Sequence, residues 1–226
     1  AAQYGLYLRR DGVLVDTATG AAKPADDELI QPISDQDAKS FQHWTPERML
    51  AERVAPFAAR AFADDALLDS LLPGHGSAMA RAIGYGISEQ RDGFPPIRAP
   101  HGFSVEWLRL QPGAEAGPFR ISERMVLMNR SDDVEVTLNR GAAAVKMPMA
   151  PRDILSVPGG TWRTIRNKGT APAELLVVCD GDQRKRIEWD ADVADAARAA
   201  GRGRDQDGWV APAHLLPEAS KLLKAG

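Results

Sequence analysis

The chain has 226 residues, of which 44% are hydrophobic and 26% are charged, and its formal net charge at pH 7 is −3. These values are ordinary for a globular protein with a substantial core, and the length suits one large domain or one small domain with an added arm. The slight negative charge excludes the broad basic field expected of a protein that binds nucleic acid or an anionic membrane.

The single cysteine, Cys179, stands at the end of an apolar run. This position favours a buried small side chain, and a lone cysteine excludes an internal disulfide. The chain begins with Ala-Ala-Gln rather than Met, as in a trimmed chain or a fragment. No secretory signal is evident and no apolar run is long enough to cross a bilayer, so a cytoplasmic location is the default expectation.

The amino-terminal residues predict an arm made of two short strands and a connection. Tyr4–Arg9 and Val13–Asp16 read as strands, and Asp11-Gly12 between them is a hairpin signal. Residues 17–35 are rich in Ala, Pro, Asp and Gly and predict a surface connection.

A helical region is predicted next. Thr45 is a suitable N-cap and Pro46 a suitable first helical residue. Pro56 is expected to divide the region into two helices, and the turn sequence at 73–76 to end it. The apolar residues at helical spacing are Leu50, Val54, Phe57, Ala61, Phe62, Leu67, Leu68, Leu71 and Leu72.

From Ala78 onward the pattern changes to short strands at close and even spacing, separated by turn residues such as Pro158-Gly159-Gly160. This pattern indicates a β-sandwich or barrel, and a helix over Ala191–Ala200 is predicted to follow it. The predicted strands are Ala82–Ser88, Phe103–Leu110, Arg124–Met128, Val134–Leu138, Ala143–Met147, Ile154–Val157, Thr161–Arg166 and Glu174–Val178.

The most specific pattern lies between Arg152 and Asn167. Four residues stand at the spacing of the second cupin motif, namely Asp153, Pro158, Gly160 and Asn167. Arg152 replaces the usual Gly of that motif, and Arg163 stands where the family places a metal-binding His. Residues from about 102 to 189 therefore resemble a cupin. The resemblance implies a mainly β fold, the double-stranded β-helix or jelly-roll barrel, with an N-terminal helical region and a C-terminal helix.

The first motif of the family supports the same resemblance. Pro112-Gly113 ends a strand, after which cupins show His-x-His and then Glu. If Glu123 is the motif Glu, Gly117 and Phe119 occupy the His positions. A shift of the register by two residues would remove Glu123 but would bring no His into the motif. Because such a metal needs about three or four N or O donors, the resemblance implies neither a metal nor another cofactor here.

The four histidines lie outside both motifs and are expected to be surface or packing residues; they are His43, His75, His101 and His214. His101 leads into the strand at Phe103 and is a candidate for the barrel mouth. The catalytic candidates are therefore Glu123, Arg163 and His101.

Ligand-binding candidates come from the same segments. Arg120, Glu123 and Arg163 are the expected lumen residues, because a guanidinium presents a rigid fork to a carboxylate or phosphate. They indicate a small organic acid or an aromatic ligand. The competing interpretation is an internal ion pair between Glu123 and Arg163. Trp107 and Trp162 are candidates for lining the pocket, although strand spacing also suits the core.

Three functions remain open. The first is a metal-free relative of small-molecule dioxygenase cupins that acts as a non-catalytic or partner-supporting subunit; the carboxyl-terminal tail also resembles such dioxygenases. The second is a metal-independent enzyme that uses Arg and Glu on an acidic or aromatic substrate. The third is a binding module for a small carboxylate or sugar acid.

The chain is predicted to divide into three parts and to form an oligomer. Residues 1–100 form an arm and a helical region, or a remnant second cupin unit. Residues 101–189 form the barrel, and 190–226 a helical tail. A homodimer or larger oligomer is expected, with the N-terminal hairpin as a swapped arm and a catalytic partner subunit as a further option.

Overall fold

A computed structural model describes residues 6–8, 14–16, 22–23, 45–98 and 101–216. The chain divides into two compact units, Ala1–Met49 and Leu50–Gly226, which are described separately. The predicted boundaries at residues 100 and 189 stay predictions.

The first unit contains a small antiparallel sheet of β1 (Leu6–Leu8), β2 (Leu14–Asp16) and β3 (Ala22–Lys23). Leu6 of β1 pairs with Asp16 of β2, which confirms that the first two predicted strands pair with each other. The predicted turn at Asp11-Gly12 lies outside the described residues, as does His43.

Helix α2 (Pro46–Arg53) begins where the sequence predicts. The Thr45 hydroxyl accepts a hydrogen bond from the backbone N–H of Arg48 at 3.2 Å, as expected of an N-cap. The second predicted helix is wrong. In its place the chain forms a short 3₁₀ turn, η2 (Phe57–Ala59), followed by turns up to residue 75.

Hydrogen bonds to side chains, one local and one from a later segment, explain why this apolar segment is not helical. The backbone N–H of Leu67 donates to the Ser70 hydroxyl at 3.0 Å, and that of Leu68 donates to the Glu89 carboxylate at 2.9 Å. Side chains thus satisfy donors that a helix would satisfy with its own carbonyls. Leu67, Leu68 and Leu72 are nevertheless buried, so the apolar spacing reports packing rather than a helix.

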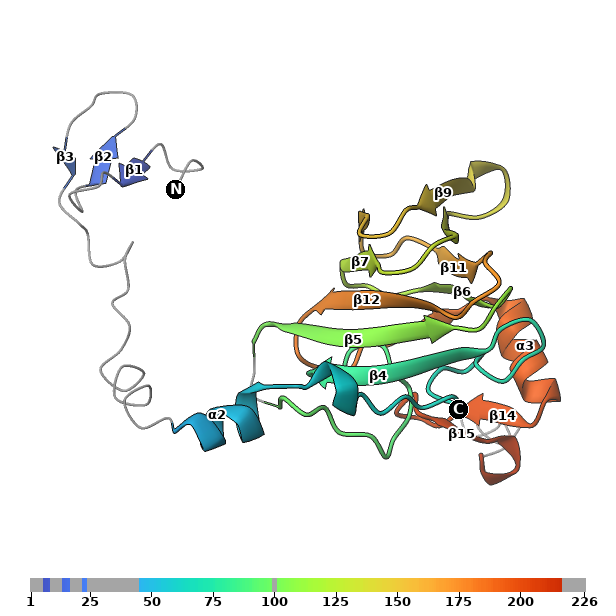
Figure 1. The fold of residues 1–226 in the computed structure, drawn as a ribbon. Helices are drawn as coiled ribbons and strands as arrows, with labels where there is room; N and C mark the ends of the chain where they lie inside the picture. Colours follow the sequence, from blue (N-terminus) through green and yellow to red (C-terminus); the bar gives the residue numbers. More distant parts are fainter. Residues whose placement is uncertain (1–5, 9–13, 17–21, 24–44, 99–100, 217–226) are drawn as a thin grey trace, which may run out of the picture. The chain divides into compact units, whose positions relative to one another are not determined.

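The second unit is built on two five-stranded antiparallel sheets, seen in Figure 1. The strand order is β10-β7-β12-β5-β4 in one sheet and β13-β6-β11-β8-β9 in the other. The first sheet comprises β4 (Ser77–Ile83), β5 (Phe103–Leu110), β7 (Met125–Asn129), β10 (Ile154–Val157) and β12 (Ala173–Asp180). The second comprises β6 (Glu115–Arg120), β8 (Val134–Leu138), β9 (Val145–Met149), β11 (Arg163–Asn167) and β13 (Glu188–Trp189).

The pairing of these strands is nested. Strand β8 pairs with β9, β7 with β10, β6 with β11 and β5 with β12, so the chain from β5 to β12 is one long hairpin wound into a barrel. This arrangement is the jelly roll, or double-stranded β-helix, and the predicted fold class is confirmed. The strand β4 extends the barrel by pairing with β5.

The predicted strand bounds agree with β5, β8 and β10, and the bounds of β7, β9, β11 and β12 are displaced by one or two residues. Strand β4 begins at Ser77, well before the predicted Ala82. Strand β6 was not among the predicted strands because Gly117-Pro118 lies inside it. Gly117 is needed there, since a Cβ at this position would lie 2.6 Å from the carbonyl oxygen of Arg163.

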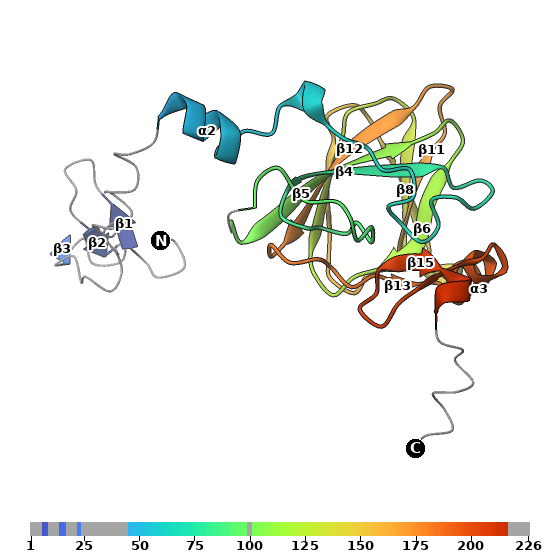
Figure 2. The same cartoon turned by 90° about the horizontal axis from the view of Figure 1, so that it is seen from below.

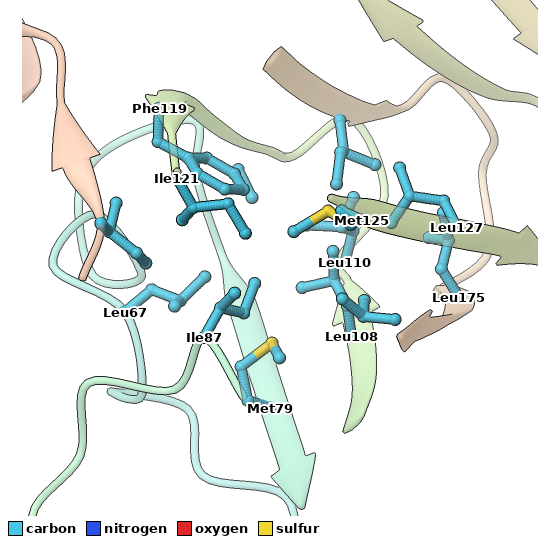
Figure 3. Close-up of a cluster of buried hydrophobic side chains, with 14 of the residues drawn as sticks. Leu67, Met79, Ile87, Leu108, Leu110, Phe119, Ile121, Met125, Leu127 and Leu175 are labelled. Carbon is cyan, nitrogen blue, oxygen red and sulfur yellow. The ribbon is translucent and has the colours of Figure 1, made fainter. Parts of the chain in front are cut away.

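Apolar side chains from both sheets fill the barrel. Alternation along β5 buries Leu108 and Leu110 and leaves Trp107 and Arg109 on the outer face. Figure 3 shows Phe119, Ile121, Met125 and other core residues packed together with side chains from the loops. The interior is therefore a packed core along most of its length.

The carboxyl-terminal part adds a helix and a hairpin beside the barrel (Figure 2). Helix α3 (Ala191–Ala199) confirms the predicted helix, and the Asp190 side chain caps it by accepting from the N–H of Asp192. The hairpin consists of β14 (Arg202–Arg204) and β15 (Val210–Pro212), and the short 3₁₀ turn η4 (Ala213–Leu215) follows it. Another short 3₁₀ turn, η3 (Gly141–Ala143), connects β8 and β9 in the barrel. Within the described ranges, none of the helices is both long and apolar enough to span a membrane.

Candidate functional site

The residues of the two sequence motifs meet at one end of the barrel. Met125, the first residue of β7, pairs with Val157 of β10 on one side and with Cys179 of β12 on the other. Cys179 in turn pairs with Ser104 of β5. All four side chains are buried, so they form one inward-facing row across this sheet.

The facing sheet supplies Phe119 and Arg163, which pair with each other across β6 and β11. Both side chains are buried, with exposed fractions of 0% and 1%. Ile121, just after β6, is also buried. Phe119, Ile121 and Arg163 therefore face the row that contains Met125 on the first sheet.

Glu123 does not belong to this row. Its side chain is half-exposed, and its carboxylate accepts a hydrogen bond from the Ser122 hydroxyl at 2.9 Å. Glu123 still lies near this end of the barrel, because its charge acts on two buried groups there. It opposes the lowering of the pKa of Arg163 by burial, and it adds to the raising of the pKa of Cys179 by burial.

Arg163 points into the barrel and has no carboxylate partner there. Its Nε and Nη2 donate to the carbonyl oxygen of Thr161 at 3.1 and 2.8 Å, and its Nη1 lies 3.4 Å from Sδ of Met125. Burial lowers the pKa of Arg163 to about 10. The expected ion pair with Glu123 is not among the ion pairs formed by the described residues.

Arg120 and Trp162 come together, but outside the barrel. Arg120 donates two hydrogen bonds to the Glu188 carboxylate, at 2.8 and 2.6 Å. Its guanidinium lies 5.0 Å from the ring centre of Trp162, and that of Arg140 lies 4.7 Å from the same ring. Arg120 is therefore a surface residue stacked on an aromatic ring and not a lumen residue.

Trp107 and His101 also lie outside the interior. Trp107 is on the outer face of its sheet, where its ring meets that of Phe57 edge-on at 5.3 Å. His101 is exposed at the motif end of the barrel, and its ring lies 5.7 Å from that of Phe103. Some of the predicted site residues, such as Arg163 and His101, thus lie at the same end of the barrel. The predicted ligand-binding residues as a set do not line one common pocket.

Neither a protein-family model nor a curated protein sequence matches the chain significantly. Among solved structures, the chain is similar to a cupin-2 domain protein from Rhodospirillum rubrum, with 13% identity, a TM-score of 0.44, and coverage of 66% of this chain and 87% of that one. It is also similar to a cupin-2 domain-containing protein from Halorhodospira halophila, with 24% identity, a TM-score of 0.36, and coverage of 44% and 66%. A third similar structure is an oxalate oxidase, with 15% identity, a TM-score of 0.43, and coverage of 62% and 67%.

The fold itself follows from the nested strand pairing, which is that of a jelly-roll barrel. The barrel is a jelly roll, the fold that the resemblance of its two motifs to cupins implies. At these levels of identity the likeness concerns the fold alone, and the chemistry depends on the side chains that this chain places in its cupin barrel.

The interior of this cupin barrel does not fit a mononuclear metal. Its inward side chains are mostly apolar, with a thioether and a guanidinium, and the buried Ser104 hydroxyl and Glu106 carboxylate are fewer O donors than the three or four that such a metal needs. Burial raises the pKa of the Cys179 thiol to about 12, so this thiol stays protonated and is a poor ligand. Across the part of the chain that the structure describes, no three His, Cys, Asp or Glu residues are grouped to hold a metal ion.

Sequence reasoning missed a buried carboxylate at this end. Glu106 on β5 is 1% exposed and accepts hydrogen bonds from the N–H groups of Ile87 and Ser88. Burial raises its pKa to about 7, and the guanidinium Nε of Arg81, 3.9 Å away, opposes the shift in part. The signal was present, because Glu106 has the same alternation as Leu108 and Leu110 and must therefore face inward.

A second buried carboxylate, Glu89, lies between the barrel and the carboxyl-terminal part. It accepts from the Trp189 indole N–H at 3.1 Å and from the N–H of Leu68. Burial raises its pKa to about 7 as well. Both carboxylates hold the 84–89 segment against its neighbours, so they act in structure, with their oxygens engaged by backbone donors.

Proposed function

We propose that this protein is a cupin-fold subunit without a metal centre in its barrel, and that it acts non-catalytically by supporting a partner or an assembly. The observation that carries the proposal is the inward row of Phe119, Ile121, Met125 and Arg163. These side chains pack the motif end of the barrel where donor atoms for a metal would have to converge.

The arrangement of the polar candidates argues against a metal-independent enzyme in the same place. A general acid or base must lie within hydrogen-bond reach of a reacting group in an accessible site. The Glu123 carboxylate accepts from Ser122, Arg120 is paired with Glu188 on the surface, and Arg163 is enclosed in the core. The three side chains therefore do not form one reaction site.

The test of the metal-free barrel is elemental analysis of the full chain, purified without chelators or a histidine tag. We expect well below one equivalent of Fe, Mn, Ni, Cu and Zn per chain, and no oxygen consumption with oxalate or simple phenols after each metal is added back. A full equivalent that survives dialysis would overturn the proposal. Loss of that metal in a His101→Ala variant would then place the site at the barrel mouth.

The assembly role is supported by the open sheet edges. Strands β9 and β10 are the outer strands of the two sheets, and they expose Val145 (53%) and Ile154 (68%). Apolar side chains on open edge strands are typical of surfaces that pair with another chain. We expect Val145→Lys and Ile154→Lys to lower the mass measured by light scattering. Leu71→Lys is the matched control, because Leu71 is comparably exposed but lies in a turn.

A further inference from the structure

A pocket of about 260 Å³ beside the β14–β15 hairpin collects four arginines. Arg186 precedes β13, Arg198 is on α3, and Arg202 and Arg204 are on β14. Figure 2 shows α3, β13 and β15 gathered on one side of the barrel. The pocket therefore lies outside the barrel interior, and none of the functional candidates from the sequence lines it.

Two of these guanidinium groups have a carboxylate partner. Arg198 pairs with Asp195 at 2.6 Å, and Nη1 of Arg204 lies 3.3 Å from the buried carboxylate of Glu89. Asp205 also lines the pocket, but its carboxylate is paired with Arg91. Each of these three acids near the pocket is thus already paired with an arginine.

The other two guanidinium groups, of Arg186 and Arg202, have no ion-pair partner among the described residues. Nη2 of Arg202 donates to the carbonyl oxygens of Asp65 and Leu67 at 3.1 and 3.2 Å, which anchors the side chain without neutralising it. Its Nε is buried and has no hydrogen-bond partner. Arg202 thus keeps an uncompensated charge at the pocket, and its environment leaves one of its donors unsatisfied.

We propose that this pocket binds the phosphate group of a small phosphorylated molecule. Guanidinium groups bind phosphate through paired hydrogen bonds. A phosphate monoester carries a charge of about −1.5 to −2 at pH 7, which matches the two uncompensated arginines, whereas a monocarboxylate would balance one of them. The pocket is also small relative to the roughly 300–1,000 Å³ of sites for whole drug-sized ligands, as a phosphate subsite should be.

A neighbouring pocket could hold the organic part of such a phosphorylated molecule. It has a volume of about 480 Å³ and shares Arg186 and Arg204 with the arginine pocket. Its other lining combines Ile121, Ile187 and Gly160 with Ser122 and the paired side chains of Arg120 and Glu188, so the surface next to the shared arginines is mixed. A ligand held by its phosphate would thus place its organic part against this surface. Binding of phosphate at the arginine pocket is independent of whether the barrel holds a metal.

The experiment is calorimetric titration of the full chain with inorganic phosphate, and with acetate and chloride at the same ionic strength. We expect saturable binding of phosphate and weaker or undetectable binding of the two monovalent anions. Arg186→Gln should weaken phosphate binding about tenfold, because one charge-assisted contact is lost. Arg186 is exposed and its guanidinium has no ion-pair partner among the described residues, so the fold should tolerate this variant.

Two further variants separate a specific site from general charge attraction. Arg166→Gln removes the same charge from an exposed position on β11 that lines neither pocket, and it should leave phosphate affinity unchanged. Arg186→Lys keeps the charge but loses the planar fork, and it should bind between the wild type and Arg186→Gln. Equal affinity for phosphate and chloride, or equal losses in Arg186→Gln and Arg166→Gln, would overturn the inference.

Discussion

Nη1 of Arg163 lies 3.4 Å from Sδ of Met125 inside the barrel, and this contact joins a buried cation to a weak acceptor. The rest of the guanidinium donates to one carbonyl oxygen, that of Thr161. A buried charge without a charged partner has an unfavourable desolvation free energy that such contacts offset in part. Substitution of Arg163 therefore tests how this buried cation affects the free energy of unfolding.

We predict that Arg163→Met is as stable as the wild type or more stable, with a free energy of unfolding up to about 2 kcal/mol higher. The reason is that an apolar side chain of similar length replaces a buried cation. Urea unfolding followed by tryptophan fluorescence measures this. Arg163→Ala is the control and should lose about 2–5 kcal/mol, since it leaves a cavity. If Arg163→Met instead lost about 3–5 kcal/mol, Arg163 would have a charged partner in solution.

The fold was predictable where the sequence carries local signals. Strand β5 alternates cleanly between buried and exposed residues, and its predicted bounds agree with the structure. Strand β4 gives no such alternation, because its first four residues are all buried. The segment around Leu67 and Leu68 carries helical spacing, but its hydrogen bonds come from Ser70 and Glu89, and Glu89 lies far along the chain. Local patterns cannot report such partners.

Motif spacing indicates which segments of the barrel meet, but not the direction or the partner of each side chain. Motif spacing brought attention to Arg163 and to the loop before β7, and both are at the same end of the barrel. It could not give the direction of Glu123, because a loop of a few residues decides which side chains face inward. Nor could it give the partner of Arg120, since Glu188 is 68 positions away in the sequence. Such pairings are set by the tertiary fold.

Asn167, singled out by its motif spacing, has a structural role that can be tested. Its side-chain amide donates to the carbonyl oxygens of Leu110, Gln111 and Ala171, and its Oδ1 accepts from the N–H of Gly169. We expect Asn167→Ala to lower the free energy of unfolding by about 2–4 kcal/mol, because buried backbone groups lose their partners. Chemical denaturation measures the loss, and a change below about 0.5 kcal/mol would show that water replaces these bonds.

His75 and Asp69 should give a pH-dependent contribution to stability. The imidazole Nδ1 lies 3.0 Å from the carboxylate of Asp69, which is fully buried. This hydrogen bond raises the pKa of His75, and burial raises the pKa of Asp69 although the same hydrogen bond opposes that rise. Because the pKa of His75 is higher in the folded state, the stabilisation is complete below the unfolded value of about 6.5 and is lost as the pH rises through the folded value.

We therefore expect His75→Asn to lose about 1–2 kcal/mol at pH 6 and less at pH 9. Thermal unfolding over this range measures the difference between the two proteins. His214→Asn is the control, because His214 is exposed in the 3₁₀ turn η4. A loss that is the same at both pH values would mean that His75 contributes packing alone.

Glu106 should make the protein less stable as the pH rises through the weakly acidic range. Burial raises its pKa from 4.5 to about 7. The folded state therefore binds more protons than the unfolded state between these values, and stability falls as the pH rises through this window. The shift corresponds to at most about 3 kcal/mol.

The Glu106→Gln variant isolates this effect, because it keeps the shape of the side chain and removes the titration. We expect the stability of the variant relative to the wild type to increase by up to about 3 kcal/mol between pH 5 and pH 8, on top of a constant loss from the altered hydrogen bond to Ser88. Urea midpoints at several pH values measure the difference. Glu89 has a similarly raised pKa, but it is present in both proteins and cancels in the comparison. Parallel curves for the two proteins would show that Glu106 is ionised throughout, with Arg81 and the backbone donors of the 84–89 segment holding its charge.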